Sequence, residues 1–392
     1  ILGEKMNDKV ILYGAYDRYN YGDNLMPILL ERFLKINFPD KTRTIDFIYA
    51  SIDSSDLSKY KCYSSIAMKD LLYTQHNSSI IVVGGEVLGA DVGTLYTHVQ
   101  QSQFYTRILK KIRRFQPKLL STIAKMFYPA VWDYPYIPQK ASFKNNVKVI
   151  YNTVGGVPVS SQTKYIAQAE YISARDRRTY EEVTKWASAE LVPDSVLIAS
   201  KIIDDQFMQD FVRKEIIDYC ATNKFITVQA CPYKVNFSAQ DLAYQLDNVK
   251  SQSSIDVVLL PIGYASGHDD VIFLREVQKL AKTELKLEYE LNIWEIMYFL
   301  SHSHSFYGTS LHGIITAMSF GVPHFCIDER IEKIKSFVQT WSVGPFTQPI
   351  SIFDIKDSVS KMNDYDNSDL LKSVEYAQQI ISESLKKISH IL

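Results

Sequence analysis

The start of the chain decides the fold, and residues 9–36 read KVILYGAYDRYNYGDNLMPILLERFLKI. Residues 9–13 form a short apolar run, and Gly14 opens a polar loop. Apolar side chains then recur at helical spacing over residues 25–36. A buried strand, a loop and an amphipathic helix in this order are typical of the opening unit of a parallel α/β sheet.

The same pattern returns through both halves of the chain. Strands are predicted at 79–83, 147–151, 171–173, 225–229, 256–261 and 305–307, and helices at 292–300 and 312–320. Alternating strands and helices predict an α/β protein with two doubly wound, Rossmann-like domains that face a cleft. The expected units are an N-terminal domain (1–193), a C-terminal domain (194–368) and a last helix (369–392) that packs back across both.

The composition narrows the class of protein. The 392 residues are 46% hydrophobic and carry a net charge of −1, which indicates a globular protein without the positive field that attracts nucleic acid. No apolar run approaches the roughly 20 residues that span a bilayer. Four cysteines lack the spacing of metal ligands, and we expect buried, reduced thiols in a cytoplasmic protein. They are Cys62, Cys220, Cys231 and Cys326.

The most informative loop follows a predicted strand, where residues 306–323 read FYGTSLHGIITAMSFGVP. Gly308 permits a tight turn before a helix that begins near His312. The free N–H groups and positive dipole end of such a helix bind anions, and Thr309 or Ser310 offers a second donor. The alternative is a capped core helix with an internally bonded histidine.

Two further loops offer polar groups at strand ends. Residues 13–23 read YGAYDRYNYGD, in which Asn20 and Asp23 present an amide and a carboxylate to sugar hydroxyls, or simply form a structural turn. Residues 259–270 end in a histidine and two aspartates. These are too few ligands to predict a metal site, and an acidic helix start is the favoured interpretation.

Arginines open the predicted helix at 173–179, which reads SARDRRT. The planar guanidinium of Arg175 suits a carboxylate or phosphate. In the alternative interpretation, Arg175 pairs with Asp194 or Asp176 and fixes the domain boundary.

A basic and aromatic insertion occupies about 100–140. Its stretch 107–136 interleaves apolar residues with Arg107, Lys110, Lys111, Arg113, Arg114 and Lys118, and ends in Phe127, Tyr128, Trp132, Tyr134 and Tyr136. This pattern is typical of a helix that lies on an anionic membrane surface. The alternative is a helical hairpin that packs on the first domain and solvates its charges.

Together these segments resemble the polysaccharide pyruvyl transferase family. The matching pieces, in the family's order, are Gly14 with 20–23, then 82–85, 173–176, 192–195, 261–263, 308–313 and 321–323. The resemblance implies a fold similar to B-type glycosyltransferases. It also implies transfer of the pyruvyl group of phosphoenolpyruvate to a sugar hydroxyl pair, which makes a ketal in surface polysaccharide such as capsule or exopolysaccharide. Phosphoenolpyruvate is the donor substrate, and no separate cofactor is implied.

The resemblance also implies roles for individual residues. The expected catalytic residues are His312 and Asp23. The expected donor-binding residues are Ser310, Thr309, Gly313, Arg175 and Lys234, and the C-terminal domain is expected to be the donor side. The expected acceptor-binding residues, on the N-terminal side, are Asn20, Tyr21, Gly85 and Glu86. The acceptor is expected to be a sugar or lipid-linked oligosaccharide, with the protein at the inner face of the membrane.

Two positions depart from the family pattern. Many members carry arginine two residues before the loop histidine, where this chain has Ser310, so Arg175 or Lys234 is expected to supply the cation. Gln229 likewise stands where arginine is common. The alternatives are a B-type nucleotide-sugar glycosyltransferase, with Glu295 or Asp328 on the ribose, and a non-catalytic sugar-binding relative.

Overall fold

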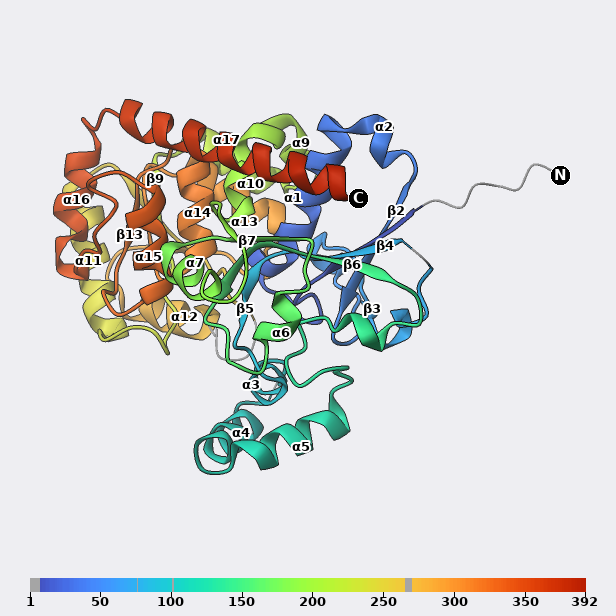
Figure 1. Ribbon diagram of the computed structural model, residues 1–392. Coiled ribbons are helices and arrows are strands. Elements are labelled where there is room, and N and C mark those ends of the chain that lie inside the picture. Colours follow the sequence, from blue (N-terminus) through green and yellow to red (C-terminus); the bar gives the residue numbers. More distant parts are fainter. Residues whose placement is uncertain (1–7, 76, 101, 265–269) are drawn as a thin grey trace.

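The computed structural model describes residues 8–75, 77–100, 102–264 and 270–392, in which two parallel sheets carry the fold (Figure 1). The first sheet has the order β3-β2-β1-β4-β6-β7-β8, with β5 beside β6. Its strands are β1 (Asp8–Tyr13), β2 (Ile45–Ser51), β3 (Ile66–Ala67), β4 (Ser78–Val82), β5 (Gly85–Leu88), β6 (Val147–Gly156), β7 (Tyr171–Ala174) and β8 (Glu190–Leu191). The second sheet has the order β11-β10-β9-β12-β13. Its strands are β9 (Phe225–Val228), β10 (Asp256–Leu259), β11 (Lys286–Leu287), β12 (Phe306–Gly308) and β13 (His324–Cys326).

Helices cover the faces of both sheets. The first half contains α1 (Tyr21–Asn37), α2 (Pro39–Thr42), α3 (Val92–His98), α4 (Gln103–Phe115), α5 (Pro117–Phe127), α6 (Thr163–Ile166) and α7 (Arg177–Val183). The second half contains α8 (Ala199–Ile202), α9 (Asp205–Gln209), α10 (Lys214–Thr222), α11 (Ala239–Gln252), α12 (Asp270–Leu280), α13 (Ile293–His302), α14 (Leu311–Ser319), α15 (Glu332–Trp341), α16 (Ile355–Met362) and α17 (Ser368–Ile391).

The central strands are buried because helices lie on both faces of each sheet. All five residues of β4, and all four of β9, are buried. Such strands read as continuous apolar runs rather than as alternating ones, which is why the sequence reveals them. The last strand of the first sheet ends at Leu191, and the first strand of the second sheet begins at Phe225. The predicted domain boundary near residue 193 lies between them.

The strand order places one crevice in each sheet. In the first sheet β1 lies between β2 and β4, and in the second β9 lies between β10 and β12, so neighbouring connections leave in opposite directions at β1/β4 and β9/β12. Loops separate at such switch points and leave room for a ligand beyond the carboxyl ends of the strands.

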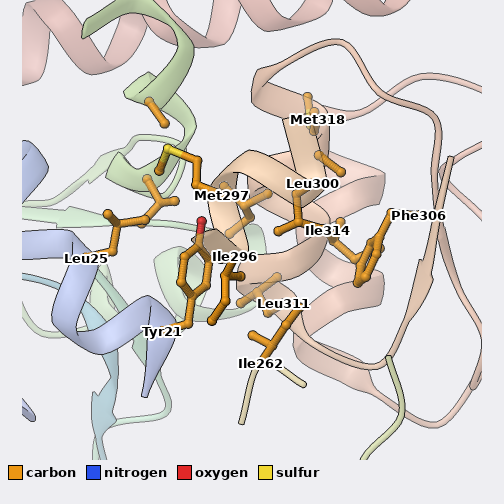
Figure 2. Close-up of a cluster of buried hydrophobic side chains, with 14 of the residues drawn as sticks. Tyr21, Leu25, Ile262, Ile296, Met297, Leu300, Phe306, Leu311, Ile314 and Met318 are labelled. Carbon is orange, nitrogen blue, oxygen red and sulfur yellow. The ribbon is translucent and has the colours of Figure 1, made fainter. Parts of the chain in front are cut away.

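The two domains share an apolar interface (Figure 2). Tyr21 and Leu25 of α1 lie against Ile296 of α13 and Leu311 of α14. The hydroxyl groups of Tyr21 and Thr316 are 2.9 Å apart and fully buried. Tyr21 therefore joins the domains and cannot contact an acceptor sugar, so its predicted role is wrong.

Helix α17 runs across the top of both domains in Figure 1. Towards its end, the hydroxyl of Ser384 lies 2.8 Å from that of Tyr171 in β7, and Lys148 of β6 donates to the carbonyl of Ile391. Its middle is anchored where Gln378 donates to the carbonyl of Leu197, and Leu370 near its start is fully buried. The helix thus contacts both domains.

Three of the four cysteines are buried, whereas Cys220 is half-buried, so the prediction of four buried thiols is wrong at that position. It lies on α10, a surface helix with few buried side chains. Within the described ranges, no helix is both long and apolar enough to cross a membrane.

Candidate active site

A cavity of about 570 Å³ lies where the carboxyl ends of the two sheets face each other. The first domain lines it with the loops after β1 and β4, with β5 and with α3, and the second domain with the loop after β9 and the starts of α14 and α15. Its polar and charged lining residues are Arg18, Asn20, Asp23, Glu86, Thr94, His98, Tyr136, Arg175, Tyr233, Lys234, His312 and Lys333. Both switch points therefore open into one space, as their position in parallel sheets predicts.

His312 lies in the first turn of α14 and is held by a buried carboxylate. Its Nε2 is 3.3 Å from Oδ2 of Asp194, whose other oxygen accepts the N–H of Val196 at 3.0 Å. Burial alone would raise the pKa of Asp194, but the charge and hydrogen bond of His312, with Arg175, lower it to about 2. Asp194 is thus a permanent anion that orients the imidazole.

Gly22 at the start of α1 makes room for the imidazole. A Cβ atom on Gly22 would lie 1.8 Å from Nδ1 of His312. Every side chain larger than hydrogen would therefore displace the ring. The first turn of α1 in the first domain and the first turn of α14 in the second therefore pack closely at this point.

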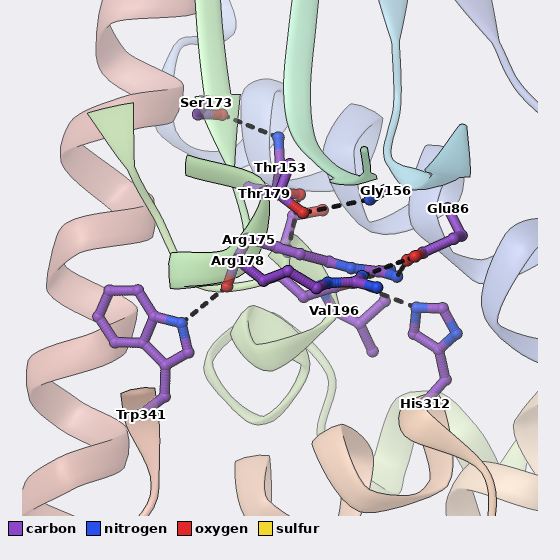
Figure 3. A network of polar contacts seen from close by, with 12 residues as sticks. Glu86, Thr153, Gly156, Ser173, Arg175, Arg178, Thr179, Val196, His312 and Trp341 are labelled. Atoms are coloured by element: carbon purple, nitrogen blue, oxygen red, sulfur yellow. Dashed lines mark hydrogen bonds and ion pairs between the residues drawn. The ribbon is translucent and has the colours of Figure 1, made fainter. Parts of the chain in front are cut away.

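Arg175 is fully buried and engages two carboxylates (Figure 3). Its Nη1 lies 3.2 Å from Asp194 and its Nη2 lies 2.5 Å from Glu86. Arg178 contacts the other oxygen of Glu86 at 2.6 Å. Burial raises the pKa of Glu86 but the two guanidinium groups and Lys333 outweigh it, so the pKa falls below its usual value. The alternative in which Arg175 pairs with Asp194 is therefore the one the structure shows.

Two lysines of the second domain bring positive charge to the cavity. Among the described residues, no ion pair joins Lys234 or Lys333 to a carboxylate, although both line the cavity. Burial and the charges of Lys234 and Arg175 lower the pKa of Lys333 to about 7, against the opposing effect of Glu86 and Asp23. The excess positive charge makes the cavity suited to an anion.

The first-domain wall adds to this field. Burial, Arg18 and cations of the neighbouring helix and loop lower the pKa of His98 to about 3, so His98 is neutral near pH 7. Arg18 is 3.4 Å from Asp17 and 3.9 Å from Asp23. Asp23 also faces Gly85, whose positive φ of 89° favours glycine.

Sequence reasoning missed Arg18, His98 and Lys333. Arg18 was within reach, since it belongs to the loop after the first strand. Lys333 follows β13 and lies in the first turn of α15, so its position after a strand was the available signal. His98 ends α3, just before the basic insertion, and carries no comparable signal.

Three predicted donor ligands lie outside the cavity lining. Thr309 is buried, its N–H donates to Gln229 at 2.8 Å, and its hydroxyl accepts from the N–H of Cys231. The N–H of Gly313 donates to the hydroxyl of Ser310, which caps α14. These groups are used in building the loop, so Thr309 and Gly313 cannot bind the donor as predicted, and Ser310 lies outside the described lining.

Gln229, the second departure from the family pattern, is part of the same support. Its amide donates to Asp270 at 2.8 Å while its oxygen accepts from Thr309. Asp270 also accepts the N–H groups of Ile262 and Gly263, and burial raises its pKa to about 6. Gln229 therefore ties the loops after β9, β10 and β12 together.

The remaining residues that the sequence suggested lie partly inside and partly outside the cavity. Glu295 caps α13 and pairs with Arg213, and Asp328 pairs with Arg330, so neither expected ribose ligand lines the cavity. His268 and Asp269 lie outside the described residues. The predicted residues that do line the cavity are His312, Asp23, Arg175, Lys234, Asn20, Gly85 and Glu86.

Solved structures share this architecture. The S. aureus protein MnaA, solved with UDP, has a TM-score of 0.56 at 12% identity over 98% of each chain. The UDP-GlcNAc 2-epimerase of Neisseria meningitidis has a TM-score of 0.52 at 11% identity, over 98% of this chain and 99% of that one. The UDP-GlcNAc 2-epimerase of Methanocaldococcus jannaschii has a TM-score of 0.52 at 10% identity, over 96% of this chain and 100% of that one. These TM-scores show a common fold, and at identities this low the comparison shows the fold alone. No curated protein sequence matches the chain.

The fold and the cleft define the class: two Rossmann-like domains of the GT-B type, with a ligand site between their strand ends. The model of the polysaccharide pyruvyl transferase family matches residues 20–330, and the chain belongs to this family. Membership supports a pyruvyltransferase activity in polysaccharide biosynthesis.

Proposed function

We propose that the protein transfers the pyruvyl group of phosphoenolpyruvate to two hydroxyls of one sugar and forms a cyclic ketal. One observation carries the proposal: Lys234 and Lys333 bring unneutralised charge into a cavity beside His312, which Asp194 holds in place. Phosphoenolpyruvate carries a phosphate and a carboxylate. A site with several cations within one cavity matches that charge.

The donor is held by the second-domain wall in this proposal. Lys234 and Lys333 contact its phosphate and carboxylate, and Arg18 completes the positive field from the first domain. Arg175 keeps Glu86 and Asp194 in place instead of contacting the donor, because its guanidinium is already engaged on both sides.

The reaction requires two proton transfers. One sugar hydroxyl attacks the central carbon of phosphoenolpyruvate as the methylene carbon gains a proton, and the second hydroxyl attacks the same carbon as phosphate leaves. The two hydroxyl groups lose two protons in total, of which one ends on the new methyl group and the other on the departing phosphate. Asp194 occupies Nε2 of His312, so Nδ1 is the nitrogen that exchanges a proton with a hydroxyl or with the phosphate.

The acceptor sugar lies on the first-domain wall in this proposal. Asn20 and Asp23 offer an amide and a carboxylate in the cavity, whereas both oxygens of Glu86 are engaged by Arg175 and Arg178. Asp23 is the residue best placed to orient a hydroxyl, because it is half-buried and 3.9 Å from its nearest cation, Arg18. Gly85 leaves the space that a sugar ring needs next to this carboxylate.

Calorimetric titration with phosphoenolpyruvate tests the proposal. We expect the native protein to bind phosphoenolpyruvate, and Lys333→Met to weaken binding by about 10- to 100-fold, as loss of a charge-assisted contact does. Lys335→Met is the matched control, because Lys335 lies exposed on the same helix. Binding of UDP, with no heat from phosphoenolpyruvate, would instead favour the nucleotide-sugar alternative.

A further inference from the structure

The hairpin of α4 and α5 exposes large apolar side chains, although Tyr128, Trp132 and Tyr136 of the predicted membrane-surface stretch are buried in the first domain and cannot contact lipid. Phe104 is 75% exposed, Phe115 68%, Met126 73% and Phe127 66%. Large apolar side chains that are exposed together on one element mark an interaction surface more often than singly scattered ones do. In Figure 1 the two helices project away from both sheets, so the patch is not shielded by the rest of the described chain.

The apolar side chains of α4 form a stripe along one face. Phe104, Ile108 and Phe115 are spaced by four and seven residues, which places them above one another on a helix of about 3.6 residues per turn. The opposite side of α4 is anchored inward by Leu109, which is 1% exposed. Beside the stripe, on the solvent side, are Arg107, Lys111 and Arg114.

The hairpin is uniformly basic. Residues 92–132 contain seven lysines and arginines and no aspartate or glutamate. An apolar stripe with aromatic side chains, flanked by cations, is the pattern of a helix that lies in the interface of an anionic bilayer. A second copy of the same surface would bring like charges together, which opposes self-association.

The hairpin lies next to the cavity. Both of its helices pack on α3, and His98 and Leu95 of α3 line the cavity. Lys110 of α4 lies 4.8 Å from the ring centre of Tyr233, a cavity residue of the second domain. A surface that binds the hairpin would therefore also lie close to the cavity.

We propose that the α4–α5 hairpin docks this protein on an anionic membrane and holds the cavity entrance at the lipid surface. The docking depends on the hairpin alone. Its purpose, to present the hydroxyls of a lipid-linked glycan to the cavity, rests on the proposed function.

Co-sedimentation with vesicles tests the docking. The full chain is mixed with vesicles of phosphatidylglycerol and phosphatidylcholine in equal parts, and with phosphatidylcholine alone. We expect binding to the anionic vesicles only, weakened on the order of 100-fold in the triple variant Arg107→Gln, Lys111→Gln, Arg114→Gln, because each cation near the surface contributes severalfold. The double variant Phe104→Ser, Phe115→Ser should also lose binding.

Phe353→Ser is the matched control, since Phe353 is 62% exposed on the second domain and should leave vesicle binding unchanged. Equal melting temperatures of all variants show that they fold. Native protein that stays in the supernatant at low salt, or binding that the hairpin variants do not change, overturns the proposal. Sedimentation velocity detects the other outcome. If the native protein does not bind vesicles but forms a dimer, and only the hairpin variants dissociate that dimer, the apolar side chains of the hairpin bind a second copy of the chain instead. Phosphoenolpyruvate titration of the same variants keeps failure of docking separate from failure of the reaction.

Discussion

The charged residues of the cavity fall into two groups that differ in their partners. Glu86, Arg175 and Asp194 form a chain of contacts in which each charge faces an opposite one, and Asp194 also contacts the imidazole of His312. Lys234 and Lys333 line the same cavity, and in the described ranges no ion pair neutralises either.

The difference between the two groups indicates that the first group supports the site and the second group binds the ligand. A group that already has an internal partner must break that contact before it binds a ligand, whereas an unpaired cation loses only water. The paired group therefore fixes the position of the imidazole, and the two lysines provide the charge that a donor anion needs. The predictions below disturb one group at a time, from the largest expected effect to the smallest.

Arg175→Met should cause the largest change, in stability. The substitution leaves Asp194 buried without its guanidinium, which typically costs about 3–5 kcal/mol of the free energy of unfolding. Denaturant unfolding measures the change. Arg178→Met is the control, because Arg178 contacts the half-exposed edge of Glu86, and exposed pairs contribute at most about 1 kcal/mol. Equal losses in the two variants would contradict the distinction between them.

His312→Ala should lower turnover by about 10²-fold or more, as loss of an acid–base group does. The protein should remain folded, since the imidazole lies at the edge of the cavity rather than in the core. Steady-state kinetics measure the effect, with His302→Ala as control because His302 pairs with Asp205 on another helix. Near-normal turnover in folded His312→Ala protein would remove His312 from the chemistry.

Gly22→Ala should lower turnover by up to about 10²-fold without direct contact with substrate, because displacement of a catalytic group by about 1 Å can cost that much. The added methyl group would overlap Nδ1 of His312 and push the ring away from Asp194. The rate constant and a structure of the variant check this together. An unmoved ring with reduced turnover would show that Gly22 acts in another way.

Donor affinity should fall as the pH rises above about 7. The pKa of Lys333 is lowered to about 7, so its ammonium loses its proton above that pH and no longer attracts an anion. The charged groups that set this pKa are Lys234, Arg175, Glu86 and Asp23. Titrations between pH 6 and 9 should show a weakening of at most about tenfold per pH unit. Lys333→Met should remove this dependence, and persistence of the slope would exclude Lys333 as its origin.

The sequence predicts the fold well where strands are buried. The segments that become β1, β4, β6, β9 and β12 each contain a short apolar run and are mostly buried, so they signal parallel strands. Strands β8 and β11 have two residues each and carry no pattern that distinguishes them from loops. The loop that begins the helix of His312 is also predictable, because strand, glycine and capping residue follow one another.

The sequence predicts less of the site, because it does not encode which way a loop side chain points. Thr309 and Tyr21 belong to the correct loops, yet the first points into Gln229 and the second into the domain interface. Arg175 lies at the correct strand end, and only the fold shows that two carboxylates converge on it. Lys333 can be recognised as a cavity residue only once the fold has placed α15 against the first domain.

A crystal structure with phosphoenolpyruvate would test the central claim most directly. We predict phosphate and carboxylate oxygens within about 3 Å of the ammonium groups of Lys234 and Lys333, with Arg175 still bound to Glu86 and Asp194. A donor bound by Arg175, released from its two carboxylates while both lysines remain in solvent, would contradict the account.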